Sequence, residues 1–313
     1  MDRLKTLSNY ACWMRIGVQL PDGLKRKAIE ICEKFENIVL SGESCFGACD
    51  IDLALLNDVD VLYHYAHTKL LNIEKVVYIP FYIDYDTEKV AERLKEIKEQ
   101  KIALISTAQY CHKLPELKKS LERRGFFVEL KKGNSRVEMP GQVLGCNYTA
   151  LKNTEADAVV FVGDGVFHAR GALLYTGKKV YSINPLNFEL KEINAQEFTR
   201  ERYFLISRCV GLKNLGILVS TKPGQKRLRL AEKIREKALK KGLKAIIVYI
   251  GEITPEKLEN LPFDFYVNTA CPRISYDDYK RFKMPIITPQ EFEVLIGERK
   301  DLAIDEIELE REK

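Results

Sequence analysis

A repeated order of short apolar runs and amphipathic segments is the feature that most constrains the fold of this chain. Three times, a strand-like run is followed by a segment of helical period, a turn and a second strand-like run. Such alternation is typical of parallel α/β units. The three copies begin near Ile16, Ile102 and Leu215, a spacing of about 100 residues.

The predicted strands follow the same order in each copy. They are residues 16–20, 37–41, 59–63 and 75–79 in the first copy, 102–106, 126–130, 158–162 and 179–183 in the second, and 215–220, 244–249, 263–268 and 285–288 in the third. In the first copy a turn at residues 21–23 is expected to lead into one amphipathic helix that runs through residue 36. In the other two copies the helices end at Gly125 and Gly242, since glycine is the residue that most often follows a helix.

At about 150 residues per domain, 313 residues would suggest two domains. The repeat instead favours three similar small α/β domains with mainly parallel sheets, at residues 1–98, 99–210 and 211–313. Their junctions are predicted at 95–101 and 209–214. One large doubly wound sheet is the alternative.

Composition places the chain among ordinary globular proteins. Hydrophobic residues make up 46% and charged residues 30%, which excludes disorder, collagen and coiled coil. No apolar run reaches the ~18 residues of a membrane span, and the first residues lack the apolar stretch of a signal peptide, so a cytoplasmic protein without a membrane partner is expected. The net charge is +5, and the basic cluster at 226–241 fits a solvated helix face better than a direct nucleic-acid surface.

Cysteine placement gives the strongest chemical signal. The chain has 8 cysteines and no C-x-x-C spacing, so zinc-ribbon, thioredoxin and ferredoxin motifs are absent. Each repeat contributes one cysteine at a turn predicted to join a strand to a helix: Cys49, Cys146 and Cys271. Ligands bind at the carboxyl ends of parallel strands, and a helix N-terminus favours thiolate. Three converging thiolates would select zinc, Cu(I) or an iron–sulfur cluster; buried core cysteines are the alternative.

The remaining cysteines carry weaker signals. Core packing is expected for four of them: Cys12, Cys32, Cys111 and Cys209. Cys45 nearly completes the C-x3-C-x2-C motif of conventional radical enzymes with Cys49, but position 52 is Asp, so that interpretation fails. Cys45 is therefore expected to need no functional explanation.

Several polar groups at strand ends are further candidates. The turn Gly163, Asp164, Gly165 lets backbone approach a ligand, and Asp164 could accept hydrogen bonds from a ribose or an ammonium, or else cap the next helix. His168 could face the same cleft. His64 and His67 have i, i+3 spacing but no neighbouring acid or cysteine set in sequence, which disfavours zinc; orienting a carboxylate or packing as buried histidines are the other options.

Gln19 and Asp22 lie at a predicted strand end. Arg273 follows Cys271 and Pro272, and its guanidinium could hold a carboxylate bidentately, although a surface salt bridge is the default expectation.

Six segments together resemble one protein family. The three cysteine segments are SGESCFGACD, GQVLGCNYTAL and NTACPRISYDD, and VQLPDGL, HYAH and VGDGVFHARG accompany them. These resemble the archaeal iron–sulfur enzyme of diphthamide biosynthesis, 2-(3-amino-3-carboxypropyl)histidine synthase, over residues 18–278.

The resemblance implies a non-conventional radical S-adenosylmethionine enzyme. Three similar domains would surround a central 4Fe-4S cluster held by Cys49, Cys146 and Cys271. The enzyme would release methylthioadenosine and transfer the 3-amino-3-carboxypropyl group to C2 of a histidine ring in translation elongation factor 2. It would act as a homodimer with an unidentified electron donor. Contacts to S-adenosylmethionine are expected from Gln19, His64, His67, Gly163, Asp164, Gly165, His168 and Arg273.

Two other functions remain open at this point. One is a non-catalytic module in which the same cysteines hold a cluster or zinc. The other is a nucleotide-sugar or phosphate-binding α/β protein without metal, which explains the glycine turns but not the cysteines.

Overall fold

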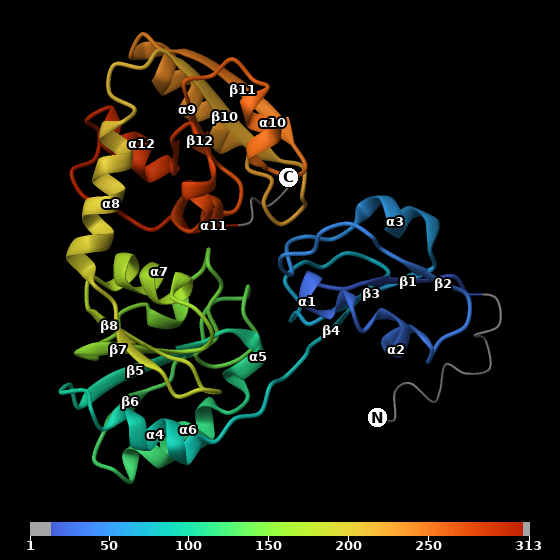
Figure 1. Ribbon diagram of the computed structural model, residues 1–313, viewed down its shortest axis with the longest axis vertical. Coiled ribbons are helices and arrows are strands. Elements are labelled where there is room, and N and C mark those ends of the chain that lie inside the picture. The colour runs from blue at the N-terminus through green and yellow to red at the C-terminus, as the bar shows by residue number, and fades with distance from the viewer. Residues whose placement is uncertain (1–13, 309–313) are drawn as a thin grey trace. The chain divides into compact units, whose positions relative to one another are not determined.

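The computed structural model describes residues 14–308 and contains three mostly parallel sheets with helices between their strands, which confirms the predicted α/β fold (Figure 1). The chain divides into two compact units, one ending at Ile83 and the other beginning at Asp84. The first sheet belongs to the first unit, and the other two belong to the second unit. Within residues 14–308, no helix is both long enough and apolar enough to cross a membrane.

The first sheet has the strand order β2-β1-β3-β4, and all its pairs are parallel. Its elements are β1 (Ile16–Gln19), α1 (Asp22–Lys25), α2 (Ala28–Cys32), β2 (Ile38–Leu40), α3 (Leu53–Asp58), β3 (Val61–Tyr65) and β4 (Val76–Ile79). The single helix expected from the turn at 21–23 through residue 36 is wrong, because α1 and α2 are separate short helices. Neither contains a fully buried residue, and helices gain most of their stability from a packed apolar face.

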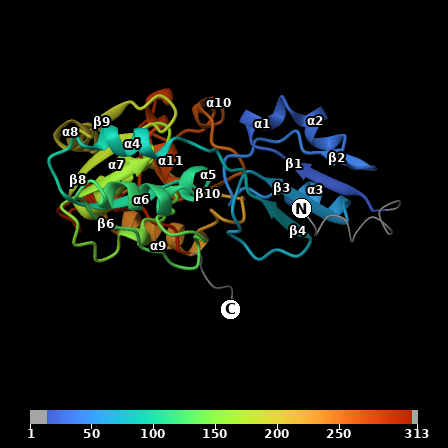
Figure 2. The same ribbon diagram turned by 90° about the horizontal axis from the view of Figure 1, so that it is seen from below.

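The second sheet has the order β6-β5-β7-β8-β9, and only its last pair is antiparallel. The strands are β5 (Lys101–Ser106), β6 (Phe127–Glu129), β7 (Ala158–Val162), β8 (Lys179–Ile183) and β9 (Leu190–Glu192). The helices are α4 (Thr87–Leu94), α5 (Ala108–Cys111), α6 (Leu114–Glu122), the 3₁₀ turn η2 (Thr149–Leu151) and α7 (Phe167–Thr176). Helices α4 and α6 pack side by side (Figure 2).

The third sheet has the order β11-β10-β12-β13 and is parallel throughout. The strands are β10 (Asn214–Ser220), β11 (Lys244–Ile250), β12 (Phe265–Asn268) and β13 (Ile286–Ile287). The helices are α8 (Ala195–Ser207), α9 (Leu228–Lys240), α10 (Pro255–Glu259), α11 (Pro272–Tyr276), the 3₁₀ turn η3 (Asp278–Arg281) and α12 (Pro289–Leu295).

Helix α8 runs between the second and third sheets (Figure 1) and is fixed by a buried ion pair. The guanidinium of Arg202 donates to both carboxylate oxygens of Glu291 on α12, each at 2.7 Å, and to the Ser275 carbonyl. Neither charged side chain is more than 1% exposed. The predicted helix ends are also found: Gly125 and Gly242 adopt φ of +92° and +78°, a conformation that favours glycine.

One topological rule orders all three sheets. In each sheet the first strand lies between the second and the third. The second strand is therefore added on one side of the first strand and the third strand on the other side. In open α/β sheets, ligands bind outside the carboxyl ends of the strands at this switch point. The fold therefore predicts where the functional groups of each sheet should gather.

Candidate cluster-binding site

The cysteine segments occupy two different positions in the repeats. Cys49 and Cys146 lie between the second and third strands of their sheets, whereas Cys271 follows the third strand of its sheet. The expectation that all three occupy equivalent turns is therefore wrong. The third-strand exits of the first two sheets carry His64 to His67 and Gly163 to Gly165 instead.

Cys49 lies in a loop anchored at the carboxyl end of β1. Gln19, the last residue of β1, donates from Nε2 to the Asp50 carbonyl at 2.8 Å and accepts from the Asp52 backbone N–H at 3.2 Å. Helix α3 begins only after Asp52, whose side chain caps it. Cys49 thus precedes the capping residue of α3 and does not belong to the first turn of that helix. Its side chain is half-buried.

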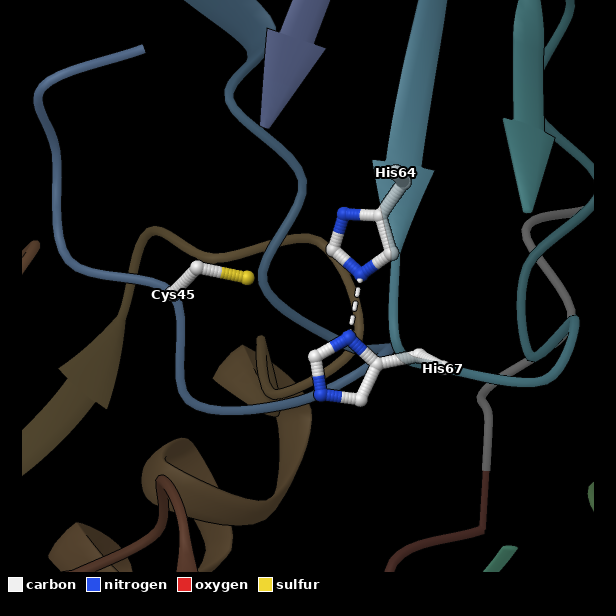
Figure 3. Close-up of side chains that lie close together, drawn as sticks. All are labelled: Cys45, His64 and His67. Carbon is white, nitrogen blue, oxygen red and sulfur yellow. Dashed lines mark hydrogen bonds between the residues drawn. The ribbon is translucent and has the colours of Figure 1, made fainter. Parts of the chain in front are cut away.

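A hydrogen-bonded chain runs from Gln19 through both predicted histidines, and Figure 3 shows its link between His64 and His67. His64 Nδ1 lies 3.0 Å from Gln19 Oε1, and His64 Nε2 lies 2.9 Å from His67 Nδ1. Because Oε1 can only accept, His64 carries its proton on Nδ1, and its Nε2 accepts from His67. Burial lowers the pKa of His64 to about 3 and that of His67 to about 4, so both rings are neutral near pH 7.

Cys45 completes this group, contrary to the expectation that no cysteine accompanies the two histidines. One ligand atom from each of Cys45, His64 and His67 lies within 4.8 Å of the others. Figure 3 shows the Cys45 sulfur directed towards the two imidazole rings. Cys45 and His64 are 2% and 0% exposed. The sequence does not reveal this contact, because the loop that contains Cys45 and the end of β3 come together only in the folded unit.

Cys271 occupies the position predicted for it, between β12 and α11. It is the residue immediately before α11 and is half-buried. Asn268, the last residue of β12, donates from Nδ2 to the Cys271 carbonyl at 2.8 Å and accepts from the Ala270 N–H at 2.9 Å. The buried amide thereby fixes the backbone on both sides of the turn.

Cys146 lies in a turn that does not enter an α-helix as predicted. Only the 3₁₀ turn η2 follows, because the Asn147 side chain accepts from both the N–H and the hydroxyl of Thr149. Such local side-chain bonds compete with helix formation. Burial raises the pKa of the Cys146 thiol, and the charges of Arg136 and Arg227 offset this only in part. The expected stabilisation of thiolate by a helix N-terminus is therefore absent here.

Arg227 connects Cys146 and Cys271 within the second unit. Its guanidinium donates to the Thr269 and Ala270 carbonyls, at 2.6 and 3.1 Å, just before Cys271. It also pairs with the fully buried carboxylate of Asp305 at 2.6 Å. Burial lowers the pKa of Arg227, but Asp305 and then the Cys146 and Cys271 sulfurs outweigh this effect and raise it. The same C-terminal segment reaches Cys146, because the Ile307 N–H donates to the Cys146 carbonyl at 2.9 Å.

Two further side chains line the same place. The pKa of the buried Tyr148 hydroxyl is well above its usual range, chiefly through burial and also through Cys146 and Cys271. Arg136 is 5% exposed, and its Nε and Nη2 make no hydrogen bond within residues 14–308. Buried donors next to a cysteine sulfur suit an anionic sulfur-rich group, whose potential responds to hydrogen bonds and nearby charge. The residues present therefore fit a thiolate-bound iron–sulfur cluster.

The Phe167 ring contacts two of the predicted site residues, Arg273 and His168. A Cβ atom on Gly145 would lie 2.2 Å from the Phe167 ring, so only glycine allows the backbone beside Cys146 to approach it. Arg273 lies over the same ring, 5.6 Å from its centre. His168 stacks on Phe161, and burial, with a contribution from the Arg273 charge, lowers its pKa to about 4.

Arg273 and Asp164 make only weak contacts of their own. Arg273 forms a surface salt bridge, as expected from the sequence: its guanidinium lies 3.3 Å from the Asp277 carboxylate, and its side chain is 56% exposed. Asp164 does not cap α7, since Val166 holds that position; it accepts from Asn184 at 3.2 Å. Both side chains can exchange these contacts for a ligand at small cost. Asp22 likewise pairs with Lys25 on the surface.

The other predicted core cysteines are mostly confirmed. Cys111 and Cys209 are each 2% exposed, and burial raises the pKa of Cys209 to about 12. Cys32 is half-buried against the core of the first sheet. Cys12 lies outside the described residues.

Sequence reasoning missed the groups that hold the cysteine turns. They are Arg136, Asn147, Arg227, Asn268 and Asp305, all 5% exposed or less. Of these residues, only Asn268 could have been noticed in the sequence, because it is a polar residue at the end of an apolar strand, three residues before Cys271. The others come from distant segments, and nothing local marks them.

Comparison with known proteins gives consistent results. Residues 20–305 match the family described as putative diphthamide synthesis protein. The chain is 38% identical to the 2-(3-amino-3-carboxypropyl)histidine synthase of Pyrococcus horikoshii, covering 94% of this chain and 89% of that protein. It is 31% identical to the synthase of Methanocaldococcus jannaschii, covering 92% and 86%.

Solved structures agree with the sequence relatives. The crystal structure of Dph2 from Pyrococcus horikoshii matches with a TM-score of 0.91 at 36% identity, covering 98% of this chain and 92% of that one. A second crystal structure of that protein, with a 4Fe-4S cluster, matches with a TM-score of 0.90 and covers 98% and 93%.

Proposed function

Since the chain belongs to the diphthamide synthesis family, we propose that it transfers the 3-amino-3-carboxypropyl group of S-adenosylmethionine to C2 of a histidine ring in translation elongation factor 2. The observation that carries the proposal is that one buried group of contacts holds both cysteine turns: Arg227 binds the backbone ahead of Cys271 and pairs with Asp305, and Ile307 of the same segment donates to the Cys146 carbonyl. The cluster in the related crystal structure supports it.

The proposed ligands of a 4Fe-4S cluster are Cys49, Cys146 and Cys271. All three are half-buried, whereas Cys45, Cys111 and Cys209 are buried, so the proposed ligands are among the sulfurs that a group outside the core can reach. Three domains, 1–98, 99–210 and 211–313, would each supply one. Three thiolates leave one iron open, and the bound cluster would supply a single electron at low potential.

The reaction is balanced as a redox-neutral transfer. One electron enters the sulfonium, and its bond to the γ-carbon breaks to give methylthioadenosine and a carbon radical. The radical bonds to C2 of the imidazole, and loss of a proton and one electron restores the aromatic ring. Radical attack avoids the poor nucleophilicity of C2.

The chain's own residues bind and orient the substrate in this scheme. We assign the methionine carboxylate to Arg273, whose exposed guanidinium offers a bidentate donor beside Cys271. Asp164 and the backbone of Gly163 and Gly165 would receive the ribose or ammonium. His168, neutral through burial, offers a ring nitrogen without adding charge. Gln19, His64 and His67 already bond to one another, so they would act through the Cys49 loop.

Anaerobic purification tests the cluster. We expect a brown protein with about four irons per chain, and loss of iron when any one proposed ligand is replaced by serine. Cys209→Ala, a buried cysteine remote from the site, is the matched control and should keep its iron. A colourless protein without iron would contradict a cluster, and bound zinc that is lost on replacing Cys49, Cys146 or Cys271 would favour a structural zinc module at these cysteines.

A product assay tests the activity. Reduced enzyme with S-adenosylmethionine and elongation factor 2 should yield methylthioadenosine and a modified factor. Accumulation of 5′-deoxyadenosine would overturn the assignment of the cleaved bond. Light scattering of the same sample tests the proposed homodimer, and reduction by cell fractions can identify the electron donor.

A further inference from the structure

The group formed by Cys45, His64 and His67 is separate in chemistry from the three proposed cluster ligands. It combines one sulfur with two imidazoles, all within the first unit. Two of the three side chains are fully buried, and the third is half-buried. A buried thiol beside two imidazoles, with ligand atoms within 4.8 Å of one another, is a donor set that suits a borderline-soft cation.

We propose that Cys45, His64 and His67 bind a divalent cation of the zinc type, distinct from the cluster. Three protein ligands would leave a fourth position open for water or another donor.

The distances support coordination after a small rearrangement. With zinc bonds of about 2.0–2.1 Å to nitrogen and about 2.3 Å to sulfur, a tetrahedral site separates two nitrogens by about 3.4 Å and nitrogen from sulfur by about 3.6 Å. The imidazole nitrogens are now 2.9 Å apart, and no pair of ligand atoms exceeds 4.8 Å. Shifts of about 1 Å or less, within the reach of side-chain rotation, would complete the geometry.

The hydrogen-bond chain prepares His64 for a metal. Gln19 Oε1 accepts from His64 Nδ1, which leaves Nε2 with the lone pair that faces His67. The Gln19 orientation is fixed, since its Nε2 donates to the Asp50 carbonyl. A backbone or side-chain acceptor on the remote nitrogen is the usual support of a metal-bound histidine. On binding, His67 moves its proton from Nδ1 to Nε2, and Cys45 releases its thiol proton to solvent.

The site has a structural consequence for the neighbouring cluster ligand. Cys45 and Cys49 belong to the same loop, while His64 and His67 lie at the exit of β3. A cation at this point would fasten the loop to that strand. It would limit the motion of Cys49 without touching its sulfur.

The test uses full-length protein in which Cys49, Cys146 and Cys271 are replaced by serine, so that no cluster competes. Titrated anaerobically with Co²⁺, this protein should bind one ion per chain, with a thiolate-to-cobalt charge-transfer band and the visible bands of four-coordinate Co²⁺, both abolished by Zn²⁺. Adding Cys45→Ala should remove the charge-transfer band and weaken Zn²⁺ at least about tenfold. Adding Cys111→Ala, also a buried cysteine, should change neither.

A thermal-shift measurement covers the case in which Cys45→Ala does not fold. Zn²⁺ should raise the melting temperature of the cluster-free protein that retains Cys45, and Mg²⁺ should not, because only the soft cation prefers sulfur and imidazole. Absence of a zinc-specific shift, or a charge-transfer band that survives Cys45→Ala, would overturn the site. Neither result depends on the cluster or on transferase activity, so the proposed function is tested separately.

Discussion

Replacing Arg227 with methionine should destabilise the second unit by about 3–5 kcal/mol, the usual cost of leaving one buried charge unpaired. The side chains of Arg227 and Asp305 are 6% and 0% exposed, and their ion pair is 2.6 Å long. Methionine keeps most of the side-chain volume of arginine but leaves the buried Asp305 carboxylate without its positively charged partner. It also removes the donors that hold the Thr269 and Ala270 carbonyls ahead of Cys271.

Urea unfolding of the cluster-free full chain, followed by far-ultraviolet circular dichroism, measures the change. Arg235→Met is the matched control, because Arg235 lies on α9, the helix that Arg227 precedes, and is an exposed arginine that donates to the Ala245 carbonyl. It should alter the unfolding free energy by less than about 0.5 kcal/mol.

A double variant separates stability from positioning. Arg227→Met with Asp305→Leu removes both charges, and apolar replacement of a buried pair is often neutral or stabilising. Its stability should recover to near that of the unmodified chain, while iron incorporation stays low, because the turn before Cys271 still lacks its anchor. If Arg227→Met unfolds within about 1 kcal/mol of the unmodified chain, or the double variant is no more stable than the single one, the reasoning is refuted.

Three other predictions concern the second unit. Glu291→Gln should cost about 3–5 kcal/mol in urea unfolding, since it leaves the Arg202 guanidinium buried and unpaired; an unchanged midpoint would contradict the pairing. Gly145→Ala should displace the Phe167 ring and lower the unfolding free energy by about 1–3 kcal/mol. Iron content, the second measurement, should fall as well. A variant with full iron content and unchanged stability would argue against this contact. The unfolding free energy should fall as the pH drops from 6.5 to about 4, because the His168 ring takes up a proton in the unfolded chain that it does not take up in the folded one. The unfolding free energy should change by at most about 1.4 kcal/mol per pH unit. His168→Phe should make this pH dependence shallower than in the unmodified chain.

The strands were predictable because their apolar runs are local and lie within one repeat. Residues 158–162 and 179–183 form strands with the bounds expected, and Gly125 and Gly242 end their helices as the sequence indicates. The prediction of one helix from the turn at 21–23 through residue 36 was wrong, because its continuity depended on packing that the folded unit does not provide.

The candidate site was predictable only in part. The three cysteines stood out by their turns, but the buried arginines and amides that hold them come from distant segments. Cys45 shows the same limit, since its contact with His64 and His67 joins a loop to a strand exit across the sheet. Spacing along the chain cannot reveal such a contact, whereas strand order can.

The shared strand order has a consequence for the history of the chain. If the three repeats descend from one duplicated unit, aligning them by strands pairs Cys49 with Cys146 but sets Cys271 against His67 and the Asp164 turn. At least one thiol was then gained or moved after duplication. A symmetric assembly of three ancestral copies would have presented equivalent ligands, so under that descent the proposed three-cysteine site arose in the fused, diverged protein and not in its building block.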